Sequence, residues 1–128
     1  RLASDLLPVL KACAEGRLAG QRLDWHPDPA LTVVMAAKGY PGSYAKGEPI
    51  HGLAEAAAMP GVSLFHAGTR REGAQTVSNG GRVLNVTATG ATLAEARARA
   101  YAALDRIDWP GGFCRRDIAW RALPKEDL

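Results

Sequence analysis

The most secure element in this sequence is a helix over residues 92–107, TLAEARARAYAALDRI. Thr92 and Glu95 have the spacing of a capping box, in which each side chain accepts a hydrogen bond from a backbone N–H that the first helical turn leaves without a partner. One apolar face recurs at helical spacing and consists of Leu93, Ala96, Ala100, Leu104 and Ile107. Because such a face has to be covered, the rest of the chain is expected to supply a sheet.

Segments with strand character cluster before this helix. Residues 31–37, LTVVMAA, are rich in β-branched side chains, and residues 62–68, VSLFHAG, and 82–88, RVLNVTA, continue the pattern. Asn79-Gly80 predicts a tight turn with positive φ, joining residues 69–78 to RVLNVTA as a hairpin. Clustered strands favour an α+β fold with a mostly antiparallel sheet and flanking helices.

Two further regions complete the predicted outline. KGYPGSYAKGEPI, residues 38–50, is expected to be an ordered loop because of its glycines and prolines, and HGLAEAAAMPG, residues 51–61, is expected to form a short helix or a turn. SDLLPVLKACAEG, residues 4–16, predicts an N-terminal helix that Ser4 caps and Gly16 ends, with Pro8 in the first turn. Its apolar face carries Leu6, Leu10 and Cys13.

Length and composition fit one soluble domain. The chain has 128 residues, 47% of them hydrophobic and 23% charged, and no apolar run of the roughly 18 residues that a membrane span needs. The start lacks a signal peptide and an initiator Met, which predicts a cytoplasmic domain of a longer protein. The two cysteines lack zinc-ligand spacing, and Cys13 is expected to be a small buried hydrophobe.

Several catalytic motifs are absent from the sequence. It contains neither a phosphate-binding G-x-x-x-x-G-K-[ST] loop nor a G-x-S-x-G nucleophile elbow. Three histidines are scattered without metal-ligand spacing. His66 is the best placed of them, but a histidine hydrogen-bonded to its neighbours is the favoured interpretation.

The segment FCRRDIAWRAL, residues 113–123, carries the strongest chemical signal. We expect a strand anchored by its apolar members, with Arg115 and Asp117 on one side and Arg116 and Ile118 on the other. The planar fork of arginine matches a phosphate, whereas a surface ion pair would contribute little. These residues alone leave the two interpretations even. The arginines of the 92–107 helix are expected to form a solvated face. The predicted anchors of the strand are Phe113, Ile118 and Trp120.

Four segments in sequence order resemble the C-terminal domain of the glycinamide ribonucleotide synthetase family, also called phosphoribosylamine–glycine ligases. They are VVMAAKGYPGSYAKG, FHAGT, GGRVLNVTATGATLAEARARAYAALDRI and RRDIAWRAL. The resemblance extends over nearly the whole chain, so residues 1–128 are expected to form the C-terminal domain of an ATP-grasp ligase. It implies a cytoplasmic enzyme of purine biosynthesis that uses Mg2+ and ATP to convert glycine to glycyl phosphate, which the amine of 5-phosphoribosylamine then attacks.

The resemblance also implies a division of labour. The nucleotide clamp and magnesium ligands of this family come earlier in the polypeptide, so we expect the isolated chain to be inactive and to hold no cofactor. It would pack on the upstream ATP-grasp domain and form a wall of the phosphoribosylamine site. By analogy with related enzymes, Arg115 and Arg116 are expected at the ribose phosphate, with Lys38 as a weaker candidate.

One position departs from the family pattern, and two rival functions stay open. The family has R-R-D-I-G where this chain has Ala119, and alanine adopts a positive φ less readily than glycine. One rival is a nucleic-acid-binding module that uses the arginines and three tryptophans, which a net charge of +3 and 6% aromatic residues disfavour. The other is a purely structural domain. The three tryptophans are Trp25, Trp109 and Trp120.

Overall fold

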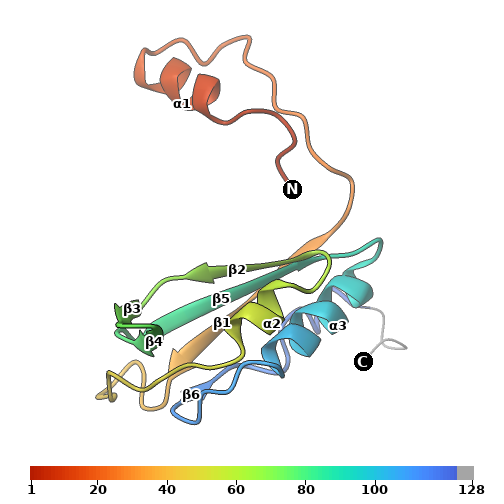
Figure 1. Ribbon diagram of the computed structural model, residues 1–128. Coiled ribbons are helices and arrows are strands. Elements are labelled where there is room, and N and C mark those ends of the chain that lie inside the picture. Colours follow the sequence, from red (N-terminus) through yellow and green to blue (C-terminus); the bar gives the residue numbers. More distant parts are fainter. Residues whose placement is uncertain (124–128) are drawn as a thin grey trace.

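The computed structural model describes residues 1–123 and has α+β architecture (Figure 1). The elements in chain order are α1 (Leu7–Ala14), β1 (Ala30–Ala37), α2 (Leu53–Ala57), β2 (Val62–His66), β3 (Thr69–Glu72), β4 (Gln75–Ser78), β5 (Arg82–Thr89), α3 (Leu93–Leu104) and β6 (Gly112–Phe113). No helix of this described part is long and apolar enough to cross a membrane.

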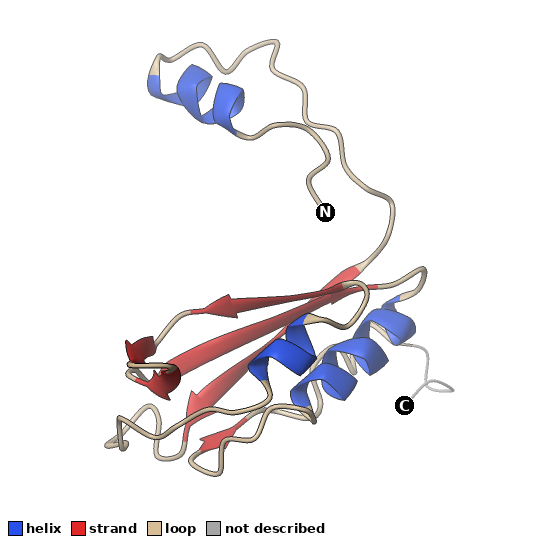
Figure 2. Ribbon diagram, in the orientation of Figure 1, coloured by secondary structure: helices blue, strands red, loops and turns tan. Residues whose placement is uncertain are grey.

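The main sheet has the strand order β2-β5-β1-β6, and every pairing in it is antiparallel. Helices α2 and α3 cover one face of it (Figure 2). In β1 the buried residues Leu31, Val33 and Met35 alternate with exposed Thr32 and Val34. The second set therefore lies on the face that carries no helix. The predicted α+β fold with a mostly antiparallel sheet is confirmed.

Helix α3 packs on the sheet through small side chains. Ala96, Ala100 and Ala103 are fully buried, which lets the helix backbone approach β5 and β1 closely. The predicted cap is present, since Thr92 Oγ1 accepts a hydrogen bond from the Glu95 N–H at 3.2 Å. The Glu95 carboxylate accepts from the Ala91 N–H at 3.0 Å, one residue earlier than a standard capping box requires.

The predicted hairpin turn at Asn79-Gly80 is wrong. The hairpin in this region joins β3 to β4 through Gly73, which has a φ of 59°, and it forms a separate two-stranded sheet. Gly80 lies in the crossing from β4 to β5, where an added Cβ would stand 2.9 Å from the Cα of Gly68. A glycine is needed there for close backbone approach rather than for positive φ.

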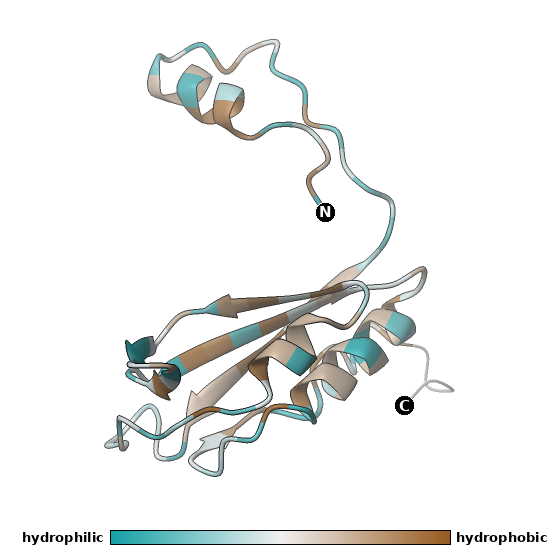
Figure 3. Ribbon diagram, in the orientation of Figure 1, coloured by the Kyte–Doolittle hydropathy of each residue, from teal (hydrophilic) through white to brown (hydrophobic). Residues whose placement is uncertain are grey.

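The N-terminal arm, residues 1–29, stands apart from the sheet (Figure 1). It folds back on itself through a bridge between Leu2 and Trp25. Hydrophobic residues occur on α1 as well as along β5 and β2 (Figure 3), yet Leu10 is 56% exposed, and Cys13, predicted to be buried, is exposed. The predicted helix is present, but the members of its predicted apolar face, Leu6, Leu10 and Cys13, are all exposed.

The ends of α1 show one correction and one agreement. Ser4 does not cap the helix, because its hydroxyl accepts a hydrogen bond from the Asp24 N–H, while Asp5 Oδ1 accepts from the Leu7 N–H at 2.9 Å. Gly16 does end it, with a φ of 68°, and the Arg17 N–H reaches back to the carbonyl of Ala12 at 2.8 Å. This is the pattern of a Schellman motif.

The closing segment is not the predicted strand. Only Gly112–Phe113 pairs with β1, and turns follow up to Leu123. Phe113 and Trp120 do not anchor it, since they are 42% and 46% exposed, whereas Ile118 does pack against the core. Ala119 has a φ of 70°, the one positive φ found at a non-glycine residue among residues 1–123, and a β-strand cannot continue through that geometry.

Candidate functional site

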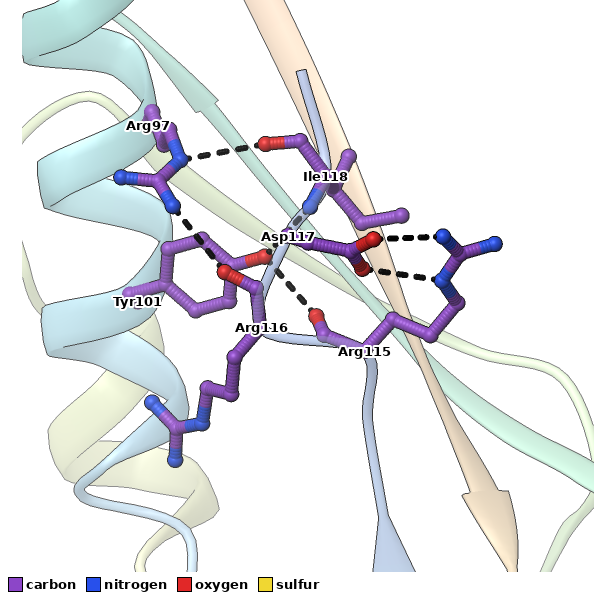
Figure 4. Close-up of polar contacts among 6 residues, drawn as sticks. All are labelled: Arg97, Tyr101, Arg115, Arg116, Asp117 and Ile118. Carbon is purple, nitrogen blue, oxygen red and sulfur yellow. Dashed lines mark hydrogen bonds and ion pairs between the residues drawn. The ribbon is translucent and has the colours of Figure 1, made fainter. Parts of the chain in front are cut away.

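The arginine loop, residues 114–118, runs from the end of β6 along the exposed side of α3 (Figure 4). Two side chains of α3, Arg97 and Tyr101, reach its backbone, while Arg115 and Arg116 project from it. The loop therefore has a backbone that is bonded to α3 and two cationic side chains that project from this backbone.

Tyr101 bonds both ends of the loop through one oxygen. Its hydroxyl donates to the carbonyl of Arg115 at 2.8 Å and accepts from the N–H of Ile118 at 3.1 Å. The ring is half-buried against the core, so the hydroxyl has a defined position.

Arg97 bonds the same loop from one helical turn away. Its Nε donates to the carbonyl of Ile118 at 3.1 Å, and its Nη2 donates to the carbonyl of Arg116 at 3.0 Å. Arg99 likewise donates to the carbonyl of Thr89. These two arginines are half-buried, so the predicted solvated face is wrong for them, because backbone carbonyls beside the helix bind their guanidinium groups.

Arg115 is held in a bidentate pair with Asp117. Its Nε lies 2.9 Å from Oδ1 and its Nη2 lies 2.6 Å from Oδ2. Hydrogen bonding from Arg115 lowers the pKa of the Asp117 carboxyl, and the same contact raises the pKa of Arg115 above its ordinary value. The Arg115 side chain is 68% exposed, so this orientation is presented to solvent.

Arg116 points toward α3. Its Nη2 lies 2.6 Å from Asp105 Oδ1, and its guanidinium carbon lies 5.5 Å from the centre of the Tyr101 ring. Hydrogen bonding to Asp105 raises the pKa of Arg116. Burial raises the pKa of the neighbouring Cys114 thiol, and the charge of Arg116 opposes that change.

The two arginines line different cavities. Arg115 borders an apolar cavity of about 310 Å³ on the uncovered sheet face, together with Val34, Tyr40 and Phe113. Arg116 borders a more polar one of about 400 Å³ beside Leu104 and Asp105. Arg115 and Arg116 are thus separated as predicted, but Ile118 borders the cavity of Arg115 rather than that of Arg116, because the backbone there is a loop and not a strand.

Lys38 lies elsewhere in the same region. Its backbone N–H donates to the carbonyl of Gly111 at 2.8 Å, and its side chain borders a third cavity beside Glu48 and Pro110. Of the three predicted site residues, the structure brings Arg115 and Arg116 into one loop and places Lys38 at a different opening.

Comparison with known proteins identifies the family. A family model described as "Phosphoribosylglycinamide synthetase, C domain" matches residues 30–121. The chain belongs to this family.

Relatives and a solved structure agree with the family model. The chain is 60% identical over 126 residues to a protein from Mesorhizobium japonicum named phosphoribosylamine–glycine ligase, covering 98% of this chain and 29% of that protein. A chloroplastic protein of the same name from Arabidopsis thaliana is 55% identical, with 100% of this chain and 24% of that protein covered. The chain thus spans less than a third of the length of these relatives.

The crystal structure of a phosphoribosylamine–glycine ligase from Thermotoga maritima matches with a TM-score of 0.66 and 33% identity. The match covers 87% of this chain and 27% of that one. Together these comparisons confirm the resemblance inferred from the four sequence segments and support it over the nucleic-acid and purely structural alternatives.

In this C-domain, the sequence interpretation missed the helical side of the site. Arg97, Tyr101 and Asp105 recur every four residues and form a polar stripe on α3 beside the arginine loop. That spacing was available in the sequence, because residues four apart on a helix lie on the same face. What the sequence did not show is that the arginine loop lies against this polar stripe.

The tryptophans do not form a common surface for nucleic-acid bases. Trp109 is buried and donates from Nε1 to Glu48 at 2.9 Å, Trp25 lies in the N-terminal arm, and Trp120 lies beyond the arginine loop. His66 is hydrogen-bonded to a neighbour, Thr69 Oγ1, at 3.0 Å. Among residues 1–123 no three His, Cys, Asp or Glu side chains gather into a possible metal site.

Proposed function

We propose that this chain is the C-terminal part of a phosphoribosylamine–glycine ligase of purine biosynthesis. The observation that carries the proposal is the identity of 60% and 55% to proteins of that name over essentially the full chain. At such identity the site residues of this chain and of these relatives are expected to serve the same substrates.

The proposed reaction joins glycine to 5-phosphoribosylamine. The glycine carboxylate attacks the γ-phosphorus of magnesium-bound ATP, which releases ADP and leaves glycyl phosphate. The amine of 5-phosphoribosylamine then attacks the acyl carbon, and inorganic phosphate departs as the amide forms. We assign the nucleotide and magnesium sites to the part of the ligase upstream of this chain.

The role proposed for this chain is to bind the 5-phosphate of phosphoribosylamine through the arginine loop. Asp117 occupies the Nε–Nη2 edge of Arg115, and the guanidinium presents further N–H donors on its Nη1–Nη2 edge, which match two phosphate oxygens. Arg116 contributes a second positive charge from the other side of the loop. Lys38 stays a weaker candidate, since it borders a different cavity.

The division of the chain follows the same proposal. Residues 30–121, which match the family model, form the substrate-binding domain, and the whole of residues 1–128 stays the C-terminal portion of the ligase. The exposed leucines of α1 are the surface that we propose to be covered by the upstream ATP-grasp domain. We place the enzyme in the cytoplasm, although the name of the Arabidopsis relative shows that a plastid can be the compartment of a relative.

Steady-state kinetics on the full-length ligase test the role of the loop. Arg115→Ala or Arg116→Ala is expected to remove a charge-assisted contact of roughly 1.5–3 kcal/mol. This corresponds to about a ten- to hundredfold fall in kcat/KM for 5-phosphoribosylamine, with glycine and ATP far less affected. Lysine at either position should restore only part of the loss, because it keeps the positive charge but lacks the planar fork of arginine.

Arg70→Ala is the matched control. Arg70 is also an exposed arginine paired with a carboxylate two residues later, Glu72, but it lies on the β3–β4 hairpin. Its removal should leave all three substrates unaffected. If both loop variants behave like this control, or if the loss falls equally on ATP, the arginines are surface ion pairs and the phosphate role is wrong.

A further inference from the structure

We propose that Tyr101 and Arg97 are positioning residues for the phosphoribosyl substrate, acting by holding the arginine loop in its binding geometry. This inference rests on the proposed function of Arg115 and Arg116, and it adds two residues of α3 that need not touch the substrate themselves. It follows from how the backbone of the loop is bonded.

The backbone of the arginine loop is bonded by side chains of α3. The carbonyls of Arg115, Arg116 and Ile118 and the N–H of Ile118 bond to Tyr101 or Arg97, at distances between 2.8 and 3.1 Å. Neither a strand ladder nor a helix supplies these four bonds. The backbone from which Arg115 and Arg116 project is therefore held by the side chains of Tyr101 and Arg97.

Tyr101 is the more specific of the two because its hydroxyl both donates and accepts. The donated bond fixes the carbonyl of Arg115, the residue that carries the first guanidinium, and the accepted bond fixes the N–H of Ile118, which packs in the core. Phenylalanine keeps the ring and its packing but loses both bonds. Tyr101→Phe thus separates the polar contacts from the structural role of the ring.

Arg97 adds an electrostatic contribution to the geometric one. Its guanidinium carbon lies 5.1 Å from the centre of the Tyr101 ring, and the guanidinium carbon of Arg116 lies 5.5 Å from the same centre. Both side chains are drawn beside this ring in Figure 4. Its charge also helps to lower the pKa of Asp117, although less than Arg115 does. A third positive charge beside the loop raises the potential that attracts a phosphate dianion.

The expected effect falls on binding rather than on chemistry, because the 5-phosphate does not react. For Tyr101→Phe in the full-length ligase we expect KM for 5-phosphoribosylamine to rise about tenfold, while kcat and the KM values for glycine and ATP change less than about twofold. Arg97→Ala should act in the same direction, and Arg97→Lys should restore part of the loss.

Two control variants match these substitutions. Tyr44→Phe removes a tyrosine hydroxyl from a ring that also packs against the core, and Arg99→Ala removes an α3 arginine that bonds a backbone carbonyl away from the loop. Both should leave the KM for 5-phosphoribosylamine unchanged. A fall in melting temperature without a change in that KM would show that Tyr101 is merely structural and would overturn the inference.

A double-mutant cycle separates this inference from the proposed function. In an Arg115→Ala, Arg116→Ala background, Tyr101→Phe should add less than about twofold, because the groups that it positions are gone. If the arginine variants raise KM and Tyr101→Phe does not, the inference fails and the proposed function stands. An undiminished effect of Tyr101→Phe without the arginines would also overturn it, and arginine variants without any effect would show that the proposed phosphate role of the loop is wrong.

Discussion

Helices α1 and α3 both carry an apolar stripe, yet only one of them is covered. In α3 the stripe consists of alanines and leucines that are buried against the sheet, whereas in α1 larger leucines point into solvent. Hydrophobicity alone does not decide which helix is covered, since α1 has the larger and more hydrophobic side chains and is the exposed helix. What decides it is whether the complementary surface lies in the same part of the protein, and for α1 we propose that it lies in the upstream domain.

The arginine loop lies between these two cases. Its backbone is bonded to α3 through side chains and Ile118 packs in the core, but both guanidinium groups face water. The three regions thus form a series from tightly packed to exposed. Substitutions along this series should have decreasing effects on stability, which gives the comparison a quantitative test.

The largest effect is expected in the covered helix. Ala100 is fully buried between α3 and the sheet, so Ala100→Glu would bury an unpaired carboxylate and should lower the free energy of unfolding of this chain by about 3 kcal/mol or more. Leu10→Glu in α1 should change it by less than about 0.5 kcal/mol, because that side chain is already exposed. Urea unfolding followed by circular dichroism measures both values.

The same pair of variants tests what covers α1. In the full-length ligase, Leu10→Glu should become clearly destabilising if the upstream domain packs on the leucines of the arm. Equal and small effects in the chain and in the full-length enzyme would contradict that packing. Equal effects of the two variants in the chain would contradict the comparison itself.

An intermediate effect is expected at Ala119, which directly follows the arginine loop. Its φ of 70° costs a non-glycine residue roughly 1–2 kcal/mol, partly offset by the greater backbone freedom of glycine in the unfolded chain. Ala119→Gly should therefore stabilise the chain by about 0.5–1 kcal/mol. Ala122→Gly, three residues later and without a positive φ, is the control and should destabilise it slightly. A melting temperature that falls for both variants would show that Ala119 is not strained.

Ala119 also shows how far the sequence leads. The resemblance placed a glycine at this position in the family, and alanine adopts a positive φ less readily, yet the sequence did not predict that Ala119 adopts one, as it does with a φ of 70°. The main strands, α3 and its cap were predicted, because alternation, helical spacing and capping are local signals. These signals need no knowledge of the rest of the chain.

The errors concern choices between competing partners. Asn79-Gly80 has the composition of a hairpin turn, but the chain turns at Gly73 and uses Gly80 for close contact with Gly68. The RRDIAWRAL segment alternates like a strand, but Arg97 and Tyr101 bond its carbonyls and hold it as a loop. In both cases the outcome depends on residues distant in sequence. The site residues Arg115 and Arg116 could be nominated from the sequence, but not the helix that positions them.

Within the arginine loop, the smallest effect is expected for its exposed ion pair. The pKa of Asp117 is lowered in the folded chain, mainly by hydrogen bonds from Arg115. A carboxyl whose folded pKa lies below its unfolded value of about 4 stabilises the fold above that pH, and the contribution is lost as the pH falls through the folded pKa. Asp117→Asn should therefore destabilise the chain slightly near neutral pH, and the difference from the unmodified chain should shrink as the pH falls from about 4 through the folded pKa of Asp117. Salt should reduce the stability difference between the Asp117→Asn variant and the unmodified chain, because both partners of the ion pair are exposed.

Arg115→Gln should produce the same pH dependence, and combining the two substitutions should add nothing further, since either one removes the pair. Thermal unfolding at a series of pH values between about 2.5 and 7 measures these differences. A difference that grows as the pH falls would have the wrong sign for a depressed carboxyl pKa and would show that Asp117 acts in some way other than by pairing with Arg115.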